Sequence, residues 1–212
     1  MNIAKFGFSL FGINTYVVYD PVSKECAIID PGMITDEERD AMVNFIKKND
    51  LKPVHLINTH LHIDHCIGNG FIQEKYGLGT SAHSADEILG KRLKEQADMF
   101  GIPFNPKDIE ITTHLKTGDV IRIGNGELKV IHVPGHSPGG IALYDEKDKF
   151  IISGDSLFQG SIGRIDLPGG DHAALLKAIR ENLFTLPDDV RVYPGHGPET
   201  QIGYERRGNP FF

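Results

Sequence analysis

The 212-residue sequence is poor in cysteine and has no long apolar run. Its two cysteines, Cys26 and Cys66, are too few for a disulfide framework, and both lie in apolar segments, so we expect two buried thiols. No stretch reaches the roughly 20 consecutive apolar residues that a membrane-spanning helix requires. The first eight residues carry neither the apolar core nor the cleavage site of a secretory signal. These absences predict a cytoplasmic protein.

Positive charge is also in the minority, with 22 lysines and arginines against 29 acidic residues and a net charge of −7. An acidic chain has no general attraction for phosphate backbones or anionic lipids, so we expect neither nucleic acid nor membranes as partners. No segment rich in proline, glycine or serine is long enough to separate two domains. We therefore expect a single domain over residues 1–212, active as a monomer or small homo-oligomer on a small molecule.

The spacing of apolar residues predicts short strands interrupted by helices. The segment Thr35–Glu38 forms a capping box that predicts a helix start, and Asp171 is expected to cap a helix over 172–186. Two strand-rich halves each finish with helices, which favours an α/β sandwich of two mixed sheets flanked by helices over a doubly wound parallel sheet. The strands are expected at 15–19, 26–29, 54–58, 120–123, 128–133, 141–144, 150–153 and 190–193, with further helices at 68–76 and 84–100.

Metal-binding side chains follow four of these predicted strands. Crowded imidazoles and carboxylates compete or repel unless a cation organises them, whereas strand ends are rigid mounts from which loops converge. Imidazole and carboxylate are ligands that Zn²⁺ accepts, and seven of them suit two ions that share a carboxylate. The remaining histidines are expected to be structural or solvated, with His83 and His132 as candidates for orienting a ligand. The candidate ligands are His60, His62, Asp64, His65, His136, Asp155 and His196.

Four segments resemble, in order, the motifs of the metallo-β-lactamase superfamily: Thr59–His65 (Thr-His-Leu-His-Ile-Asp-His), Pro134–Gly139, Gly154–Phe158 and Pro194–Gly197. The resemblance extends from about Asn14 to Tyr204. It implies an αββα sandwich with metals at one edge of the two sheets. It further implies one metal bound by His60, His62 and His136, a second bound by Asp64, His65 and His196, and a bridging Asp155, with Asp64 also expected to be catalytic.

Several branches of this superfamily fit the sequence poorly. True lactamases of the fold typically carry cysteine where this chain has Asp155, and the oxygen-reducing di-iron branch has glutamate where it has His62. The glyoxalase II-like group, the persulfide dioxygenases and the lactonases remain. The segment 160–164 is similar to a loop in which a basic residue meets glutathione, so Arg164 is the candidate substrate-binding residue. The segment 203–211 resembles the end of small single-domain glyoxalase II-like hydrolases, which lack the helical domain that supplies much of the glutathione site.

The expected function is that of a thioesterase of the hydroxyacylglutathione hydrolase (glyoxalase II) type. A metal-bound hydroxide would attack the thioester carbonyl, because a bound cation lowers the pKa of water to about 7. The expected cofactors are two divalent ions, with zinc as the first choice and iron or manganese as alternatives. An iron-dependent persulfide dioxygenase, a lactonase of the same fold and a metal-binding protein without catalysis are the competing hypotheses.

Overall fold

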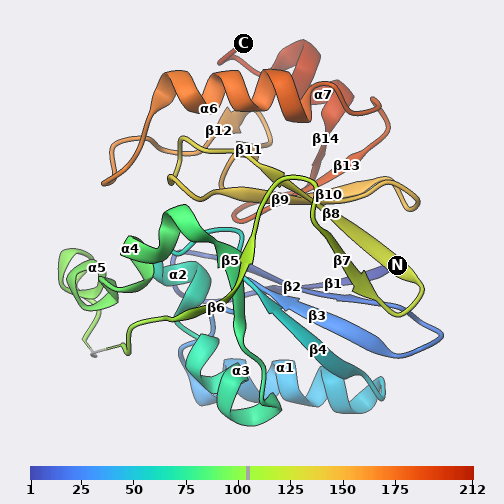
Figure 1. The fold of residues 1–212 in the computed structure, drawn as a ribbon, viewed down its shortest axis with the longest axis vertical. Coiled ribbons are helices and arrows are strands. Elements are labelled where there is room, and N and C mark those ends of the chain that lie inside the picture. The colour runs from blue at the N-terminus through green and yellow to red at the C-terminus, as the bar shows by residue number, and fades with distance from the viewer. Residues whose placement is uncertain (104–105) are drawn as a thin grey trace.

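The computed structural model describes residues 1–103 and 106–212. Two sheets pack face to face, and helices cover the outer side of each (Figure 1). The first sheet has the strand order β1-β2-β3-β4-β5-β6, and the second has the order β14-β13-β10-β9-β8-β7. In the first, the pairs β3/β4, β4/β5 and β5/β6 are parallel, whereas β1/β2 and β2/β3 are antiparallel. In the second, β10 and β13 are parallel and the other pairs antiparallel. The predicted αββα sandwich of mixed sheets is confirmed.

The elements follow one another along the chain as two halves. The first half contains β1 (Asn2–Gly7), β2 (Asn14–Tyr19), β3 (Glu25–Ile29), α1 (Asp36–Lys48), β4 (Lys52–Ile57), α2 (Ile63–Cys66), α3 (Asn69–Tyr76), β5 (Thr80–His83), η1 (Ser84–Asp86), α4 (Glu87–Gly90), α5 (Leu93–Met99) and β6 (Ile111–Leu115). The second contains β7 (Val120–Ile123), β8 (Gly126–His132), β9 (Ile141–Asp145), β10 (Phe150–Gly154), β11 (Leu157–Phe158), β12 (Ser161–Ile162), α6 (His172–Ala178), η2 (Ile179–Leu183), β13 (Arg191–Pro194), β14 (Thr200–Gln201) and α7 (Ile202–Gly208).

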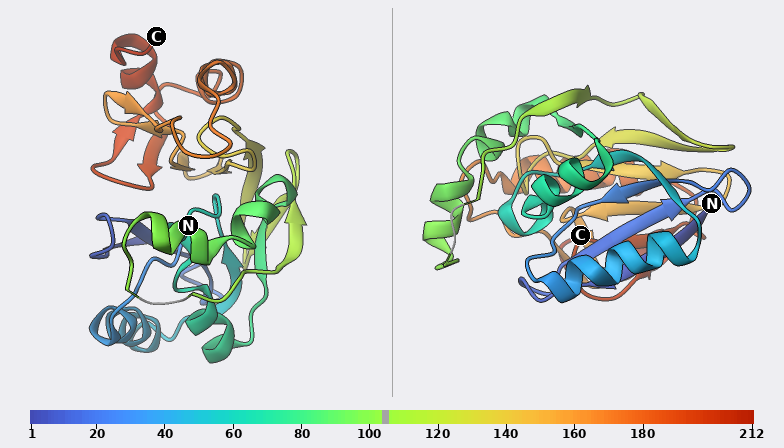
Figure 2. Two further views of the ribbon diagram at one scale, coloured as in Figure 1. Left: turned by 90° about the vertical axis from the view of Figure 1, so that its left-hand side faces the viewer. Right: turned by 90° about the horizontal axis from the view of Figure 1, so that it is seen from below.

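Helix α1 begins at the predicted capping box. The Thr35 hydroxyl accepts a hydrogen bond from the backbone N–H of Glu38 at 3.2 Å, and the Glu38 carboxylate accepts one from the Thr35 N–H at 3.2 Å. These two bonds satisfy N–H groups that have no partner within the helix. Met42 and Ile46 lie on the buried face of the helix, which packs on the outer side of the first sheet (Figure 2).

The expected helix over 84–100 is broken into three short pieces. The backbone carbonyl of Gly90 accepts a hydrogen bond from Ile109 N–H at 2.9 Å, so it is committed to a partner outside the helix. A side chain at position 90 would also crowd Leu61, whose Cδ1 lies 2.9 Å from the position of a Cβ. The expected helix over 172–186 likewise ends earlier, with α6 passing into one π-helical turn, η2.

Strands β1, β5 and β6 were not predicted. The four residues of β5 are Thr-Ser-Ala-His, which lack the alternation of apolar and polar residues, and β6 buries only its two end residues, Ile111 and Leu115. β5 and β6 are strands because β4, β5 and β6 pair in parallel across the sheet, and β1 is a strand because it pairs antiparallel with β2. Non-local pairing therefore decides their structure rather than local pattern.

The main core fills the space between the sheets. Tyr16, Ile29 and Ile57 of the first sheet meet Leu143 and Ile152 of the second in one buried cluster. Both cysteines are free and buried, as expected. No helix within residues 1–103 and 106–212 is long and apolar enough to cross a membrane.

Candidate metal centre

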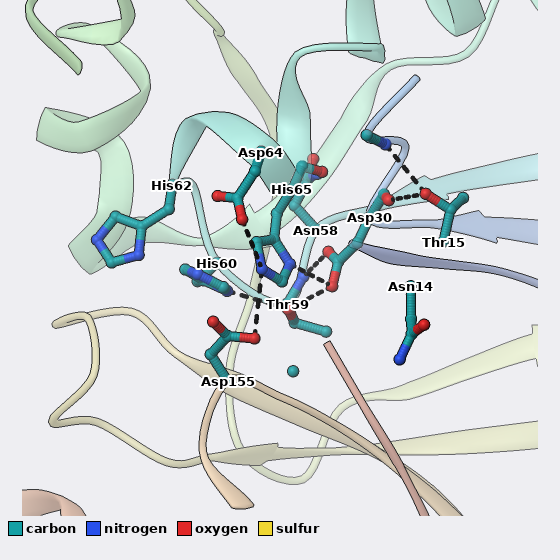
Figure 3. Close-up of polar contacts among 12 residues, drawn as sticks. Asn14, Thr15, Asp30, Asn58, Thr59, His60, His62, Asp64, His65 and Asp155 are labelled. Carbon is teal, nitrogen blue, oxygen red and sulfur yellow. Dashed lines mark hydrogen bonds and ion pairs between the residues drawn. The ribbon is translucent and has the colours of Figure 1, made fainter. Parts of the chain in front are cut away.

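The candidate ligands meet in the segments that follow β4, β8, β10 and β13. Figure 3 shows five of them, His60, His62, Asp64, His65 and Asp155. The segment after β4 carries four of the candidate ligands, and the short helix α2 turns two of these, Asp64 and His65, inward. The other three follow β8, β10 and β13. The structure thus brings together all seven side chains, which form three groups that could each hold an ion: His60, His62 and His136; His60, His65 and Asp155; and Asp64, His65 and His196.

The first group consists of three buried imidazoles. The Nε2 atom of His136 lies 2.9 Å from His62 Nδ1 and 3.2 Å from His60 Nε2. Burial, together with neighbouring imidazoles, lowers the pKa of His60 well below its ordinary value and that of His62 to about 3. The rings of His60 and His62 are therefore neutral at physiological pH, and neutral imidazoles offer the lone pairs that a cation needs.

The group of Asp64, His65 and His196 combines imidazoles with a carboxylate. Asp64 Oδ2 lies 3.1 Å from His196 Nε2 and 3.8 Å from His65 Nε2. Burial raises the pKa of Asp64, but the adjacent imidazoles of His65 and His196 outweigh it and lower the pKa overall. Burial in turn lowers the pKa of His65, but the carboxylates of Asp155, Asp64 and Asp30 raise it overall. This mutual stabilisation keeps Asp64 ionised in a buried position.

Asp155, which forms the remaining group with His60 and His65, lies between the two groups just described. Its Oδ2 is 3.5 Å from both His136 Nε2 and His196 Nε2, and its Oδ1 is 3.3 Å from His65 Nε2. Despite that proximity, His65 Nε2 and Asp155 Oδ1 make no hydrogen bond with any residue that the structure describes. Two buried polar atoms that face each other without forming a hydrogen bond fit a shared cation. Nitrogen and oxygen donors on both sides of one carboxylate fit two divalent ions.

Asp30 supports this centre and was not predicted to do so. Its carboxylate accepts hydrogen bonds from the Thr59 N–H at 2.7 Å, the Thr59 hydroxyl at 2.6 Å and His65 Nδ1 at 3.0 Å (Figure 3). All three residues are almost fully buried. A proton on His65 Nδ1 leaves the Nε2 lone pair pointing into the centre. The available signal was position, because Asp30 follows β3 as Asp155 follows β10.

Asp86 joins two ligand-bearing segments from behind. Its carboxylate accepts hydrogen bonds from Leu61 N–H at 3.0 Å, the Ser137 hydroxyl at 2.9 Å and Gly139 N–H at 2.5 Å. Leu61 stands between two candidate ligands, and Ser137 follows His136. This buried carboxylate therefore fixes the separation of the segments that carry the first group of imidazoles.

The position of the segment that carries His196 depends on Asn14, which bonds it, and on Gly195 within it. Asn14 donates from its amide to the carbonyls of Pro194 at 3.0 Å and Gly197 at 2.9 Å. Gly195 passes so close to the centre that a Cβ there would lie 2.1 Å from Asp155 Oδ1 and 2.6 Å from His65 Cε1. Only glycine lets the backbone approach the carboxylate in this way.

The remaining predicted site residues lie at the margin. His83 and His132 stack on each other with ring centroids 4.0 Å apart, and His132 Nε2 bonds the Pro138 carbonyl at 2.9 Å, so neither bonds a candidate ligand directly. The Arg164 guanidinium forms two hydrogen bonds with the Asp166 carboxylate, at 2.8 and 2.7 Å. It is the Arg164 carbonyl that contacts the centre, by accepting from His136 Nδ1 at 2.8 Å.

A cavity of about 530 Å³ opens above these residues. Its floor is formed by candidate metal ligands, and most of its walls are apolar. The lining consists of Phe11, His62, Asp64, Phe100, His136, Asp155, Phe158, Ser161, Ile162, Arg164, Leu167 and His196. A substrate in this cavity would lie directly over the candidate ligands.

The fold and this centre define a metallo-hydrolase, and comparison with known proteins gives the family. The profile described as "Metallo-beta-lactamase superfamily" matches residues 9–196, and the chain belongs to that superfamily. The protein named hydroxyacylglutathione hydrolase GloC of Haemophilus influenzae is 34% identical over 212 residues, which cover 100% of this chain and 98% of that protein.

Two solved structures are similar over almost the whole chain. The crystal structure of BLEG-1 B3 metallo-beta-lactamase has a TM-score of 0.88 and 33% identity, and covers 99% of each chain. The crystal structure of TTHA1623 in a di-iron-bound form has a TM-score of 0.86 and 32% identity, and covers 99% of this chain and 100% of that one. Likeness to proteins with different names identifies the fold and the type of centre, and leaves the substrate to be argued from the cavity.

Proposed function

We propose that this protein is a two-metal thioester hydrolase of the hydroxyacylglutathione hydrolase type. The observation that carries the proposal is the position of Asp155, whose carboxylate reaches candidate ligands of both groups: Oδ2 lies 3.5 Å from His136 Nε2 and from His196 Nε2, and Oδ1 lies 3.3 Å from His65 Nε2. One ion would be held by His60, His62 and His136, and the other by Asp64, His65 and His196, with Asp155 shared between them.

Two bound divalent cations would supply a nucleophile at neutral pH and polarise the substrate carbonyl. The chain itself positions the reactants. Asp64 lines the cavity and would accept the proton released as water adds to the carbonyl carbon. A new C–O bond forms and the C–S bond breaks. The departing thiolate takes up the proton held by Asp64, so the products are a carboxylic acid and a thiol. A thiolate is a good leaving group, so a thioester suits this centre.

The relative from Haemophilus influenzae supports glutathione thioesters as the first substrates to test, and the di-iron form of TTHA1623 supports iron beside zinc as a candidate metal. The purified protein should be stripped with a chelator and reloaded with zinc, iron or manganese. Metal content by elemental analysis and hydrolysis of S-lactoylglutathione are then measured on the same samples. Two equivalents of metal with turnover are expected. One equivalent of iron without turnover would reject the proposal.

Variants at the proposed ligands test the assignment residue by residue. His62→Ala and Asp155→Ala should lose metal and turnover while circular dichroism keeps the spectrum of the folded protein. His172→Ala is the matched control, since this exposed histidine lies at the start of α6. If either ligand variant retained full metal content and activity, the assignment would be wrong.

Hydrolysis of a β-lactam is a second candidate, favoured by the structural likeness to BLEG-1. A lactam amide requires protonation of its leaving nitrogen, which a thioester sulfur does not. A chromogenic β-lactam assayed beside S-lactoylglutathione separates the two, and faster turnover of the lactam would favour this second function. Oxygen uptake with a persulfide, measured on the iron-loaded protein, would instead favour a persulfide dioxygenase.

A further inference from the structure

The walls of the cavity are built from apolar side chains of two separate parts of the chain. In one part of the wall, the rings of Phe11 and Phe100 meet edge to face, with centroids 5.3 Å apart and planes at 64°. Phe11 follows β1 and Phe100 follows α5, so tertiary structure alone brings them together. The Phe11 side chain is half exposed, at 52%. An aromatic pair that lines a cavity and stays accessible offers a surface for an apolar ligand.

The second part of the wall is also apolar, and hydrogen bonds to residues behind it hold it in place. Phe158 lies with its ring centroid 6.4 Å from that of His196, and Ile162 lines the cavity beside it. The turn between β11 and β12 is anchored by the buried carboxylate of Glu205, which accepts from Gly160 N–H at 2.9 Å. Asn209 Nδ2 bonds the Glu205 carboxylate at 2.8 Å and the carbonyl of the neighbouring Ser161 at 3.0 Å. A wall fixed in this way is preorganised for its ligand.

Charge contributes little to recognition in this cavity. Among the lining residues that the structure describes, Arg164 carries the positive charge. Its guanidinium is already paired with the Asp166 carboxylate. Asp64 and Asp155 place negative charge on the floor. The polar groups of the floor are directed at the reacting carbonyl, which leaves the apolar walls to distinguish one thioester from another.

We propose that the cavity selects thioesters with an aromatic or branched aliphatic group beside the scissile carbonyl. This group lies against Phe11 and Phe100 when the carbonyl is over the metal centre. The inference rests on the proposed thioester hydrolase function and adds the substrate class. Burial of a phenyl-sized group contributes about 10- to 100-fold to binding, so its effect should appear in kcat/KM.

The test compares S-lactoylglutathione with S-mandeloylglutathione on the metal-loaded protein, since the two share a thiol and a hydroxyacyl group and differ by methyl against phenyl. We expect kcat/KM to be at least tenfold higher for the mandeloyl thioester. Phe100→Ala and Phe11→Ala should each reduce this ratio several-fold. Phe211→Ala is the matched control, since this exposed ring does not contribute to the described lining of the cavity, and it should keep the ratio.

The outcomes distinguish failure of the proposed substrate class from failure of the proposed hydrolase function. Turnover of both thioesters with a ratio near one, or a high ratio that both cavity variants retain, would overturn the substrate class while leaving the hydrolase function standing. Absence of turnover with either thioester, on protein that contains two equivalents of metal, would overturn the proposed function itself.

Discussion

Replacement of Asp30 by asparagine exchanges one carboxylate oxygen for an NH₂ group at almost constant volume. The retained oxygen can still accept from Thr59 N–H, now 2.7 Å from Oδ1. The NH₂ group takes the place of Oδ2, which accepts from the Thr59 hydroxyl at 2.6 Å and from His65 Nδ1 at 3.0 Å. The hydroxyl can rotate and accept instead, but an imidazole N–H cannot. His65 must therefore move its proton from Nδ1 to Nε2.

That change of tautomer acts on metal binding more than on folding. The Nε2 atom of His65 lies 3.3 Å from Asp155 Oδ1, and a proton there would occupy the lone pair proposed to bind the ion. Loss of a partner that orients a ligand typically weakens metal affinity about 10- to 100-fold. Loss of one charge-assisted hydrogen bond lowers the free energy of unfolding by about 1–3 kcal/mol, which a domain with about 5–15 kcal/mol can tolerate.

The assay dialyses Asp30→Asn against graded chelator concentrations and measures retained metal by elemental analysis, with urea unfolding of the metal-free protein run in parallel. Asp189→Asn is the matched control, because it makes the same chemical change at an exposed ion pair with Lys149. Metal affinity of Asp30→Asn equal to that of the control would refute the tautomer argument. So would a loss of affinity that is fully accounted for by unfolding.

Three further predictions concern the backbone, pH and the metal itself. Gly195→Ala should lose metal and turnover, since its Cβ would lie 2.1 Å from Asp155 Oδ1, whereas Gly70→Ala, with open space around it, should keep both in the same metal assay. The pKa of Asp20 is held well below its ordinary value, chiefly by the hydrogen bond that its carboxylate accepts from Asn125 N–H. The ionised carboxylate therefore stabilises the fold fully above about pH 4, and this contribution is lost as pH falls towards the pKa of the folded state. The stability difference between wild type and Asp20→Asn should accordingly shrink from pH 7 to pH 3 in urea unfolding, and a constant difference would contradict this. Removal of bound metal should lower the midpoint of thermal unfolding. Free metal at 100 times its Kd should restore about 2.7 kcal/mol of unfolding free energy per site. An unchanged midpoint would contradict metal binding to the folded state.

Local sequence was sufficient for the features that depend on neighbouring residues. The capping box at Thr35–Glu38 could be predicted because both of its hydrogen bonds close within one helical turn. The cluster from His60 to His65 could be interpreted as a metal site because four ionisable groups in six residues need a common cause. The two sheets followed from the order of apolar segments, which the structure confirms.

Contacts between distant segments could not be predicted from local sequence. Asp30 supports His65 from the end of β3, and Asp86 joins segments from different halves of the chain. Strand β5 depends on pairing with β4 and β6, and the meeting of Phe11 with Phe100 depends on where α5 packs. The sequence by itself determined which chemical groups are present and which predicted strands they follow. Only the tertiary structure decided which carboxylate orients which imidazole and what lines the cavity, because those choices depend on distances between residues that no local pattern contains.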